Sequence, residues 1–467
     1  MEKTPVPLLD LAARYGKEYL ELVAKRPVRA ELSADELRSR LAVPLTQPGE
    51  PPETVLERLA GAGRRGTIAS QGPRYFGFVV GGSLPVATAA DWLASAWDQN
   101  CGIFALSPVV SVVEDVAASW LRDLAGLPGS WSVGFVTGCQ MANFTALAAA
   151  RQHLLAKAGW DVNAHGLFGA PTIQVFVSDE SHYTIFAALR MLGMGAERLQ
   201  RIPTDDQGRM RAQPLIAALR SANGPCLVCA QAGNVNTGAF DPITDIVEAT
   251  RERDAWLHVD GAFGLWAAAS PQRRSLVAGV DRADSVATDA HKWLNVPYDC
   301  GVMFCAHPDA HRRAMSMSAA YILESAAERD PRDFVPEESR RARAVPVYAA
   351  LATLGRDGLA DLVERTCRLA ARMASRLSTH QSLRILNDVV LNQVLVRIEG
   401  ADPDALTRDM IVRLQQDGTC WAGGTTWHGM AALRISISNW STTEVDIDRS
   451  ADAIVAATDA AIGQLQT

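Results

Sequence analysis

The sequence has no long apolar run, no basic stripe and no targeting segment. None of its apolar stretches reaches the roughly 18 residues of a membrane span, and the longest candidate, 144–155, is interrupted by Arg151. The formal net charge is −7, and no run of Lys and Arg is interleaved with aromatic residues, so we expect no nucleic-acid partner. Glu2 and Lys3 open the chain without the apolar segment of a signal peptide. These absences favour a cytoplasmic enzyme without a membrane partner.

The composition is that of a globular protein, with 48% hydrophobic and 21% charged residues among 467. Eight scattered cysteines are expected to be free thiols, because a chain of this size without a secretion signal seldom needs a disulfide framework. Cys226 and Cys229 form a C-x-x-C, but no second pair or spaced histidines accompany them. We therefore expect no metal site.

Changes in pattern divide the chain into four parts. We expect an N-terminal segment at 1–55, a large domain at 56–310, a mobile loop and linker at 311–345, and a small α+β domain at 346–467. Strands alternate with helices in the large domain, which predicts a mostly parallel α/β sheet covered on both faces. Such sheets bind ligands at the carboxyl ends of their strands.

The expected elements follow the apolar periodicity. In the large domain, strands are predicted at 132–137, 173–178, 226–230, 255–259, 285–288 and 301–306, and helices at 141–157, 213–221 and 243–254. In the C-terminal part, helices are predicted at 344–373, 404–416 and from about Thr443, and strands at 383–386, 392–398 and 432–438.

Four strand ends carry residues that are candidates for chemistry. Gly138 lies where a strand meets a helix N-terminus, and such a terminus binds anions. His182 follows the second strand, and Asp260 ends a buried strand where an unpaired carboxylate would be costly. Lys292 lies between His291 and a tryptophan, where burial is expected to lower the pKa of the lysine and make it nucleophilic. Taken singly, each has a structural interpretation: a turn, a helix cap, a structural acceptor, a solvated lysine.

Together the four match the needs of pyridoxal 5′-phosphate. Lys292 would hold the cofactor as a Schiff base, and Asp260 would keep the pyridine nitrogen protonated so that the ring accepts electrons. His182 would stack on the ring, and the small Ala262 would pack beneath it.

At this point the sequence resembles the group II pyridoxal-dependent decarboxylases, which include aromatic-L-amino-acid, glutamate and tyrosine decarboxylases. HVDGAFG and the lysine of DAHKW, 32 residues after Asp260, carry the resemblance, which extends from about Pro73 to the C-terminus. It implies the fold type I (aspartate aminotransferase-like) architecture and a homodimer with active sites at the subunit interface. It also implies that backbone groups of Cys139 and Gln140, with His291, hold the phosphate.

The sequence departs from the family pattern at the phosphate. Cys139, Gln140 and Met141 stand where the family usually has serine or threonine before a glutamate. Asp289 stands where asparagine is usual and would repel the phosphate if ionised. Either Thr288 serves instead or Asp289 points away. Asn234 or Asn236 stands in place of the family's threonines and is a candidate partner for the cofactor's phenolic oxygen or the substrate.

A further departure concerns the family's mobile loop, whose tyrosine returns a proton after carbon dioxide leaves. The segment between Tyr321 and Tyr348 contains no tyrosine, and Phe334 is its only aromatic residue. A phenyl ring has no acidic proton to give. In related enzymes, loss of that hydroxyl accompanies oxidative, aldehyde-forming chemistry. Alternatively, His182, a water or another residue supplies the proton. Three arginines of this segment are expected to anchor it by ion pairs: Arg340, Arg341 and Arg343.

The sequence predicts a pyridoxal-phosphate-dependent L-amino-acid decarboxylase that releases carbon dioxide and an amine, and it leaves the substrate open. The alternatives are an aldehyde synthase, another carbon–carbon lyase, and a cofactor-binding scaffold without turnover. An apolar segment, 75–80, suits an aromatic or aliphatic side chain, and 98–100 suits a polar one. The candidate substrate residues are Phe78, Trp97, Asn100, Phe334, Trp427 and His428.

Overall fold

The computed structural model describes residues 6–45, 47–316 and 328–464. The chain divides into two compact units, here called unit 1 (residues 1–80, 372–386 and 395–467) and unit 2 (residues 81–371 and 387–394). No helix within the described residues is both long and apolar enough to cross a membrane. The domain boundaries expected from the sequence stay a prediction.

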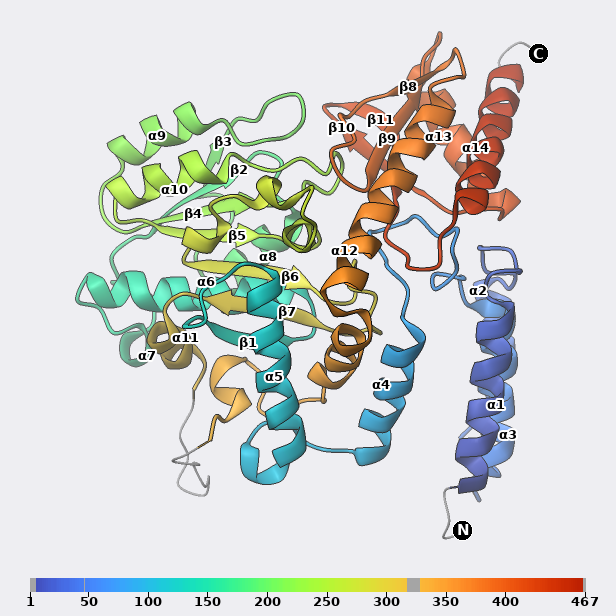
Figure 1. Ribbon diagram of the computed structural model, residues 1–467, viewed down its shortest axis with the longest axis horizontal. Helices are drawn as coiled ribbons and strands as arrows, with labels where there is room; N and C mark the ends of the chain where they lie inside the picture. Colours follow the sequence, from blue (N-terminus) through green and yellow to red (C-terminus); the bar gives the residue numbers. More distant parts are fainter. Residues whose placement is uncertain (1–5, 46, 317–327, 465–467) are drawn as a thin grey trace. The chain divides into compact units, whose positions relative to one another are not determined.

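Unit 1 combines N-terminal helices with a four-stranded antiparallel sheet of order β10-β11-β9-β8 (Figure 1). The strands are β8 Leu383–Ile385, β9 Gln393–Ile398 (its first two residues belong to unit 2), β10 Gly423–Trp427 and β11 Met430–Ser436. The helices are α1 Val6–Leu22, α2 Ala34–Leu41, α3 Pro52–Gly66, α13 Pro403–Asp417 and α14 Glu444–Gln464. Helix α13 packs on both α14 and β11.

Unit 2 is built on a seven-stranded sheet of order β1-β7-β6-β5-β4-β2-β3 (Figure 1). Its strands are β1 Ser132–Val136, β2 Gln174–Ser178, β3 Gln200–Ile202, β4 Cys226–Gln231, β5 Trp256–Asp260, β6 Ser285–Asp289 and β7 Gly301–Cys305. Only β7 runs antiparallel to its neighbours. The other six strands are parallel, so their carboxyl ends share one edge.

The helices of unit 2 connect and cover these strands. They are α4 Pro85–Trp97, α5 Pro108–Leu124, α6 Cys139–Lys157, α7 Val162–His165, α8 Tyr183–Met191, α9 Ala212–Ser221, α10 Ile243–Glu252, α11 Pro308–Met315 and α12 Ala344–Leu377, which ends in unit 1. Short 3₁₀ helices lie at Phe104–Leu106, Gly264–Ala269, Arg274–Val277, Val280–Arg282 and Pro331–Phe334.

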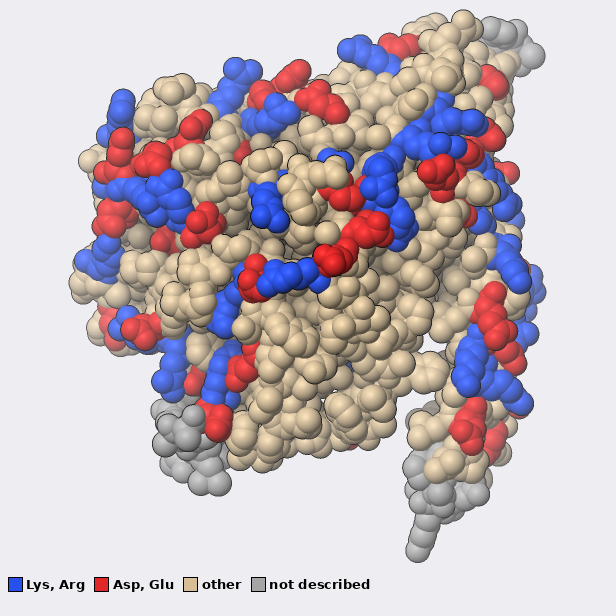
Figure 2. Space-filling model, viewed as in Figure 1, with Lys and Arg blue, Asp and Glu red and all other residues tan. Residues whose placement is uncertain are grey.

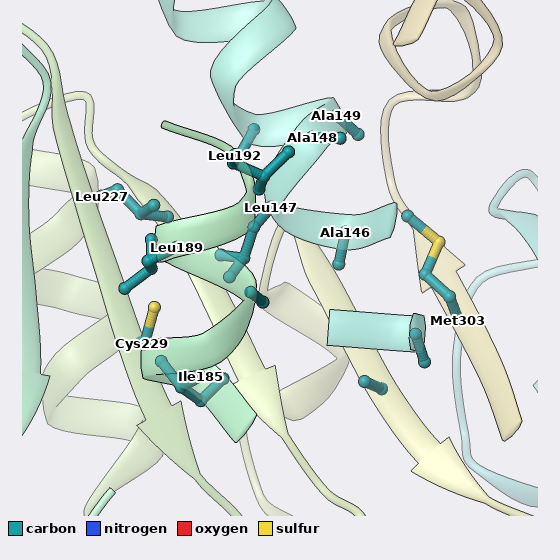
Figure 3. Packing of buried hydrophobic residues seen from close by; sticks show 14 of the residues in the cluster. Ala146, Leu147, Ala148, Ala149, Ile185, Leu189, Leu192, Leu227, Cys229 and Met303 are labelled. Carbon is teal, nitrogen blue, oxygen red and sulfur yellow. The ribbon is translucent and has the colours of Figure 1, made fainter. Parts of the chain in front are cut away.

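Helix α6 is the centre of the core of unit 2 (Figure 3). Its alanines let it lie close to β1, β5, β6 and β7, while Leu147 packs among side chains of α8 and β4 such as Leu189 and Leu227. Each such fully buried leucine contributes roughly 1.5–3 kcal/mol. Gly301 of β7 is also required here, because a Cβ at this position would overlap the backbone of Gly138. The start of α6 is thereby held against the sheet.

The expected strands and helices are confirmed to within a few residues. The sequence pattern missed β3 and β10, since β3 has only three residues and β10 (GGTTW) lacks apolar alternation. It also did not resolve α1 to α5 as separate helices. Helix α12 is interrupted at Gly355, whose φ of 61° is left-handed. All eight cysteines are free thiols and are buried.

Candidate functional site

The carboxyl edge of the large sheet brings the predicted residues together. Gly138 follows β1, His182 follows β2, Asp260 ends β5 and Asp289 ends β6. Because these four strands are parallel, their ends meet at one edge, and β5 and β6 are direct neighbours. Strand ends spread over more than 150 residues of sequence therefore form one site.

Asp260 is buried and held by three neutral donors, from Ala262, Cys139 and Asn143, and these four residues are here called the Asp260 cluster. Its Oδ1 accepts from the Ala262 amide at 3.1 Å and from the Cys139 Sγ at 3.5 Å, and its Oδ2 accepts from Asn143 Nδ2 at 3.1 Å. Burial, together with the charges of Asp260 and Asp289, raises the pKa of the Cys139 thiol well above its usual value, which keeps it protonated and able to donate. A carboxylate offers about four acceptor positions, so one on Oδ2 stays open for a further donor.

A chain of hydrogen bonds behind Asp260 has a fixed direction. Because Asn143 donates its amide hydrogen to Asp260, its Oδ1 must accept from His258 Nε2, at 2.9 Å. His258 Nδ1 then accepts from the Ser285 hydroxyl at 2.9 Å, and Ser285 accepts from Trp256 Nε1 at 2.9 Å. Burial lowers the pKa of His258 to about 4, so the imidazole is neutral and has the single N–H that this chain needs.

Lys292 and Asp289 form a second cluster at the start of α6. Asp289 Oδ2 lies 3.0 Å from Lys292 Nζ, and its Oδ1 accepts the Cys139 amide at 2.6 Å. His291 Nε2 lies 3.4 Å from the same Oδ1, while His291 Nδ1 accepts the Cys300 amide at 3.1 Å. Asp289 thus points toward the helix N-terminus and not away from it.

The expected lowering of the Lys292 pKa is wrong. Burial is the largest single influence and lowers the pKa of Lys292, but the surrounding acidic groups, Asp289 foremost, together outweigh it and raise the pKa to about 12. The sequence showed an apolar tryptophan beside the lysine but not the ion pair. Lys292 is therefore an ammonium ion at neutral pH in this arrangement.

Three other predicted residues follow the strands β2, β5 and β4. His182 caps α8, and its Nδ1 lies 2.8 Å from the Thr184 hydroxyl, which in turn accepts from Asn143 at 3.5 Å. Ala262 is half-buried beside Asp260. The loop after β4 lies against Gly264, and the buried Nδ2 of its Asn234 has no hydrogen-bond partner among the described residues.

The remaining predicted cofactor residues have mixed environments. Gln140 is exposed on the first turn of α6. The buried Thr288 hydroxyl donates to the Gly261 carbonyl at 2.9 Å, which uses its only hydrogen. A Cβ on Gly138 would lie 3.2 Å from His291 Cε1, so glycine keeps the turn open beside that ring.

The candidate substrate residues belong to both units. In unit 1, Phe78 is exposed and stacks on Trp421, while Trp427 is buried in the small sheet beside the exposed His428. In unit 2, Trp97 is exposed at the end of α4, and Asn100 accepts the backbone amides of 102 and 340. Their roles toward a substrate stay predictions.

Phe334 is held by its surroundings. Its ring lies 5.2 Å from the His311 ring and 4.5 Å from the Arg329 guanidinium. Residues 317–327 of the expected mobile loop lie outside the described residues. The predicted anchoring by arginines is confirmed: Arg340 pairs with buried Glu114 at 2.8 Å, Arg341 with Asp91 at 2.7 Å, and Arg343 with Asp299 at 2.8 Å.

Sequence reasoning missed the residues that support the site. Asn143 lies one turn after Cys139 on the same face of α6, and this i, i+4 spacing was the available signal. His258 is the first residue of HVDGAFG, and nothing in that motif indicates its contact with Asn143. Tyr298, whose ring lies 4.4 Å from the His291 ring, was not singled out. Gly81 was also missed, although a Cβ there would overlap the Lys292 carbonyl oxygen.

These residues fit pyridoxal 5′-phosphate. Lys292 provides an amine for the aldehyde, the open acceptor on Asp260 suits a protonated pyridine nitrogen, and the unpaired Asn234 amide suits the phenolic oxygen. The start of α6 provides backbone amides for an anion.

The comparisons agree with this fit. Residues 38–399 match the model of the pyridoxal-dependent decarboxylase conserved domain. The chain is 26% identical to an aromatic-L-amino-acid decarboxylase of Bacillus atrophaeus (91% of this chain, 90% of that protein). It is 25% identical to a 4-hydroxyphenylacetaldehyde synthase of Rhodiola rosea (94% and 91%).

The fold comparison confirms the predicted architecture. The structure of Oryza sativa TDC with PLP and tryptamine superposes with a TM-score of 0.91 at 22% identity, covering 98% of this chain and 99% of that one. The family model matches most of the chain, including every residue of the Asp260 and Lys292 clusters. The chain belongs to the pyridoxal-dependent decarboxylase family and is a pyridoxal-phosphate-dependent amino-acid carboxy-lyase.

Proposed function

We propose that this enzyme decarboxylates an L-amino acid to an amine, with Lys292 as the residue that binds the cofactor covalently and Asp260 as the partner of the pyridine nitrogen. One observation carries this assignment. Asp260 is a buried carboxylate with three neutral donors and an open acceptor position, on the strand next to the one that leads to Lys292. A buried carboxylate of this kind gains most from a cationic partner.

Each residue then has a defined task. Bound pyridoxal phosphate supplies an electron sink for the pair left behind when the α-carboxylate departs. Asp260 holds a proton at the ring nitrogen, and Asn143 and His258 keep the carboxylate in place and oriented. His182 covers the ring, and Asn234 donates its unpaired amide hydrogen to the phenolic oxygen.

The return of a proton to the substrate carbon decides the product. Phe334 has no acidic proton, so His182, at the start of α8, is the proposed donor and an amine is the product. The second candidate is aldehyde formation with oxygen as oxidant. It is favoured by the lack of tyrosine between Tyr321 and Tyr348 and by the likeness to the Rhodiola rosea enzyme.

The first test is covalent trapping. Borohydride reduction of the full chain with pyridoxal phosphate should remove its visible absorption band and label Lys292. Lys292→Ala should lose the labelled adduct and all turnover, whereas Lys157→Ala, which removes an exposed lysine paired with Asp254, should keep both. A reducible adduct that persists in Lys292→Ala would contradict the assignment.

The product is tested with a panel of L-amino acids. Carbon dioxide, amine, aldehyde and peroxide are measured together in each reaction. Amine without peroxide supports decarboxylation alone, and aldehyde with peroxide supports the second candidate. Carbon dioxide release from none of the amino acids would contradict both.

We also propose a homodimer. Exposed apolar side chains gather on α4 and α5, namely Trp92, Leu93, Trp97, Val109 and Val112. Figure 2 shows few charged side chains over the part of unit 2 where these helices lie. Exposed apolar side chains gathered in this way are typical of protein interfaces. Sedimentation equilibrium of the full chain measures the association, and a monomer at micromolar concentration would contradict it.

A further inference from the structure

Asp289 is a buried carboxylate to which the proposed function gives no task. Both of its oxygens are engaged, Oδ1 with the Cys139 amide at 2.6 Å and Oδ2 with Lys292 Nζ at 3.0 Å. His291 Nε2 lies 3.4 Å from Oδ1. Asp289 therefore contacts, at the same time, three groups that lie at the start of α6 and at the reactive lysine.

These three groups are the ones assigned to the cofactor. The Cys139 amide and His291 are expected to hold the phosphate, and Lys292 must give up its proton before it attacks the aldehyde. A carboxylate and a phosphate at one helix N-terminus also repel each other, with an energy that grows as the site is desolvated. Asp289 and the cofactor thus require the same donors.

We propose that Asp289 is a built-in competitor of the cofactor: its carboxylate occupies the phosphate-binding amide of Cys139 and holds Lys292 as an ammonium ion, and it must release both before the cofactor is fully bound. The inference rests on the proposed function. Its consequence is that Asp289, rather than the donors themselves, limits the affinity for the cofactor and the rate of its attachment to Lys292.

The charges around Lys292 set the sign of the pH dependence. Lys292 is faced by Asp289 and His291 from its own loop, by Cys139 of α6, by Asp260 of β5 and by Tyr298. Asp289 is the foremost of the acidic groups that raise the pKa of Lys292 to about 12 against the effect of burial, so the neutral amine is scarce at pH 7 and becomes more abundant as the pH rises. Attachment should therefore accelerate with pH, and removal of the Asp289 charge should move that rise to lower pH.

The test compares the wild type with Asp289→Asn, which keeps the shape and removes the charge. The full chain is freed of cofactor with hydroxylamine and reloaded, and the visible band gives the affinity and the rate between about pH 6 and 9. We expect the variant to bind pyridoxal phosphate at least about tenfold more tightly, with faster attachment. Asp254→Asn is the matched control, because it removes the same charge from an exposed aspartate paired with Lys157 and should change neither.

Pyridoxal, which lacks the phosphate, distinguishes the contact of Asp289 with the Cys139 amide from its contact with Lys292. The gain in affinity should be larger for pyridoxal phosphate than for pyridoxal, because only the former competes for the Cys139 amide. Equal gains, or loading and pH dependence identical to the wild type, would overturn the inference. Asp289→Ser repeats the measurement if Asp289→Asn does not fold. If the wild type itself forms no adduct with pyridoxal phosphate, the proposed function fails instead.

Discussion

Asp260 and Asp289 end neighbouring strands and are both buried, yet their surroundings are opposite in kind. Asp260 is held by neutral donors backed by the directed chain through Asn143 and His258. Asp289 is held by an ammonium group and a helix N-terminus. Cys139 takes part in both clusters, since its thiol donates to one carboxylate and its amide to the other.

We infer from this difference that Asp260 binds the cofactor, whereas Asp289 competes with it. A buried carboxylate is costly unless it is paired, and Lys292 balances Asp289 within the chain. Among the described residues, no lysine or arginine forms an ion pair with Asp260, which leaves its charge for a cationic ring nitrogen. The two aspartates are thus about equally buried, but only Asp260 has a charge that is left for the ligand to neutralise.

The largest loss of turnover should come from replacing Asp260 itself. Asp260→Asn keeps the volume but cannot stabilise a protonated pyridine nitrogen, so kcat should fall by about a thousandfold or more. Steady-state release of carbon dioxide measures it. Asp254→Asn, an exposed aspartate of the same unit, should retain wild-type turnover. A loss of less than about tenfold in Asp260→Asn would remove the distinction between the two carboxylates.

A smaller loss of turnover is expected when Asn143, which holds the Asp260 carboxylate, is replaced. Asn143→Ala takes away one donor of the carboxylate and leaves His258 Nε2–H unpaired, which costs roughly 1–3 kcal/mol of folding stability. Because Asp260 is then less well oriented toward the ring nitrogen, kcat should fall by about tenfold to a hundredfold. Since Asn143 acts through Asp260, the pH at which the cofactor's visible band titrates should also shift. Asn163→Ala, at a surface asparagine bonded to the Arg313 carbonyl, is the control. An unshifted band would make the role of Asn143 purely structural.

The sequence was sufficient for the sheet, for its carboxyl edge and for the residues that end its strands. Apolar runs separated by helical periods identify β5 and β6, and their ends place Asp260 near Lys292 without any contact being known. The partners of those residues were not predictable in the same way. Asn143 and Ser285 reach the site through packing of α6 and β6, and a hydrogen bond between side chains on different elements leaves no periodic signal.

The error about Lys292 has the same origin. Burial could be inferred from the apolar neighbours, but the pKa depends on the balance between burial and the nearby acidic groups, of which Asp289 at 3.0 Å has the largest effect. Asp289 was recognised as an unusual residue three positions before the lysine. Its direction, toward Cys139 and Lys292 rather than away, is decided by the turn that follows β6, and the sequence does not specify that turn.

The last comparison concerns His258 and a histidine that has no contact with the Asp260 cluster, and its effect on turnover should be the smallest. Burial lowers the pKa of His258 to about 4 and that of His311 to about 3, and His311 lies between the Ser132 hydroxyl and the Phe334 carbonyl. A histidine in the unfolded chain titrates near pH 6.5, whereas these two histidines in the folded chain stay neutral down to about pH 4. The free energy of unfolding is therefore highest above about pH 6.5 and falls as the pH drops toward 4. Each histidine should contribute a loss of about 3 kcal/mol, measured by urea unfolding.

His258→Gln and His311→Gln should each weaken this pH dependence, but only His258→Gln should alter the visible band and kcat. If both variants changed the band equally, the chain behind Asp260 would have no special connection to the ring nitrogen.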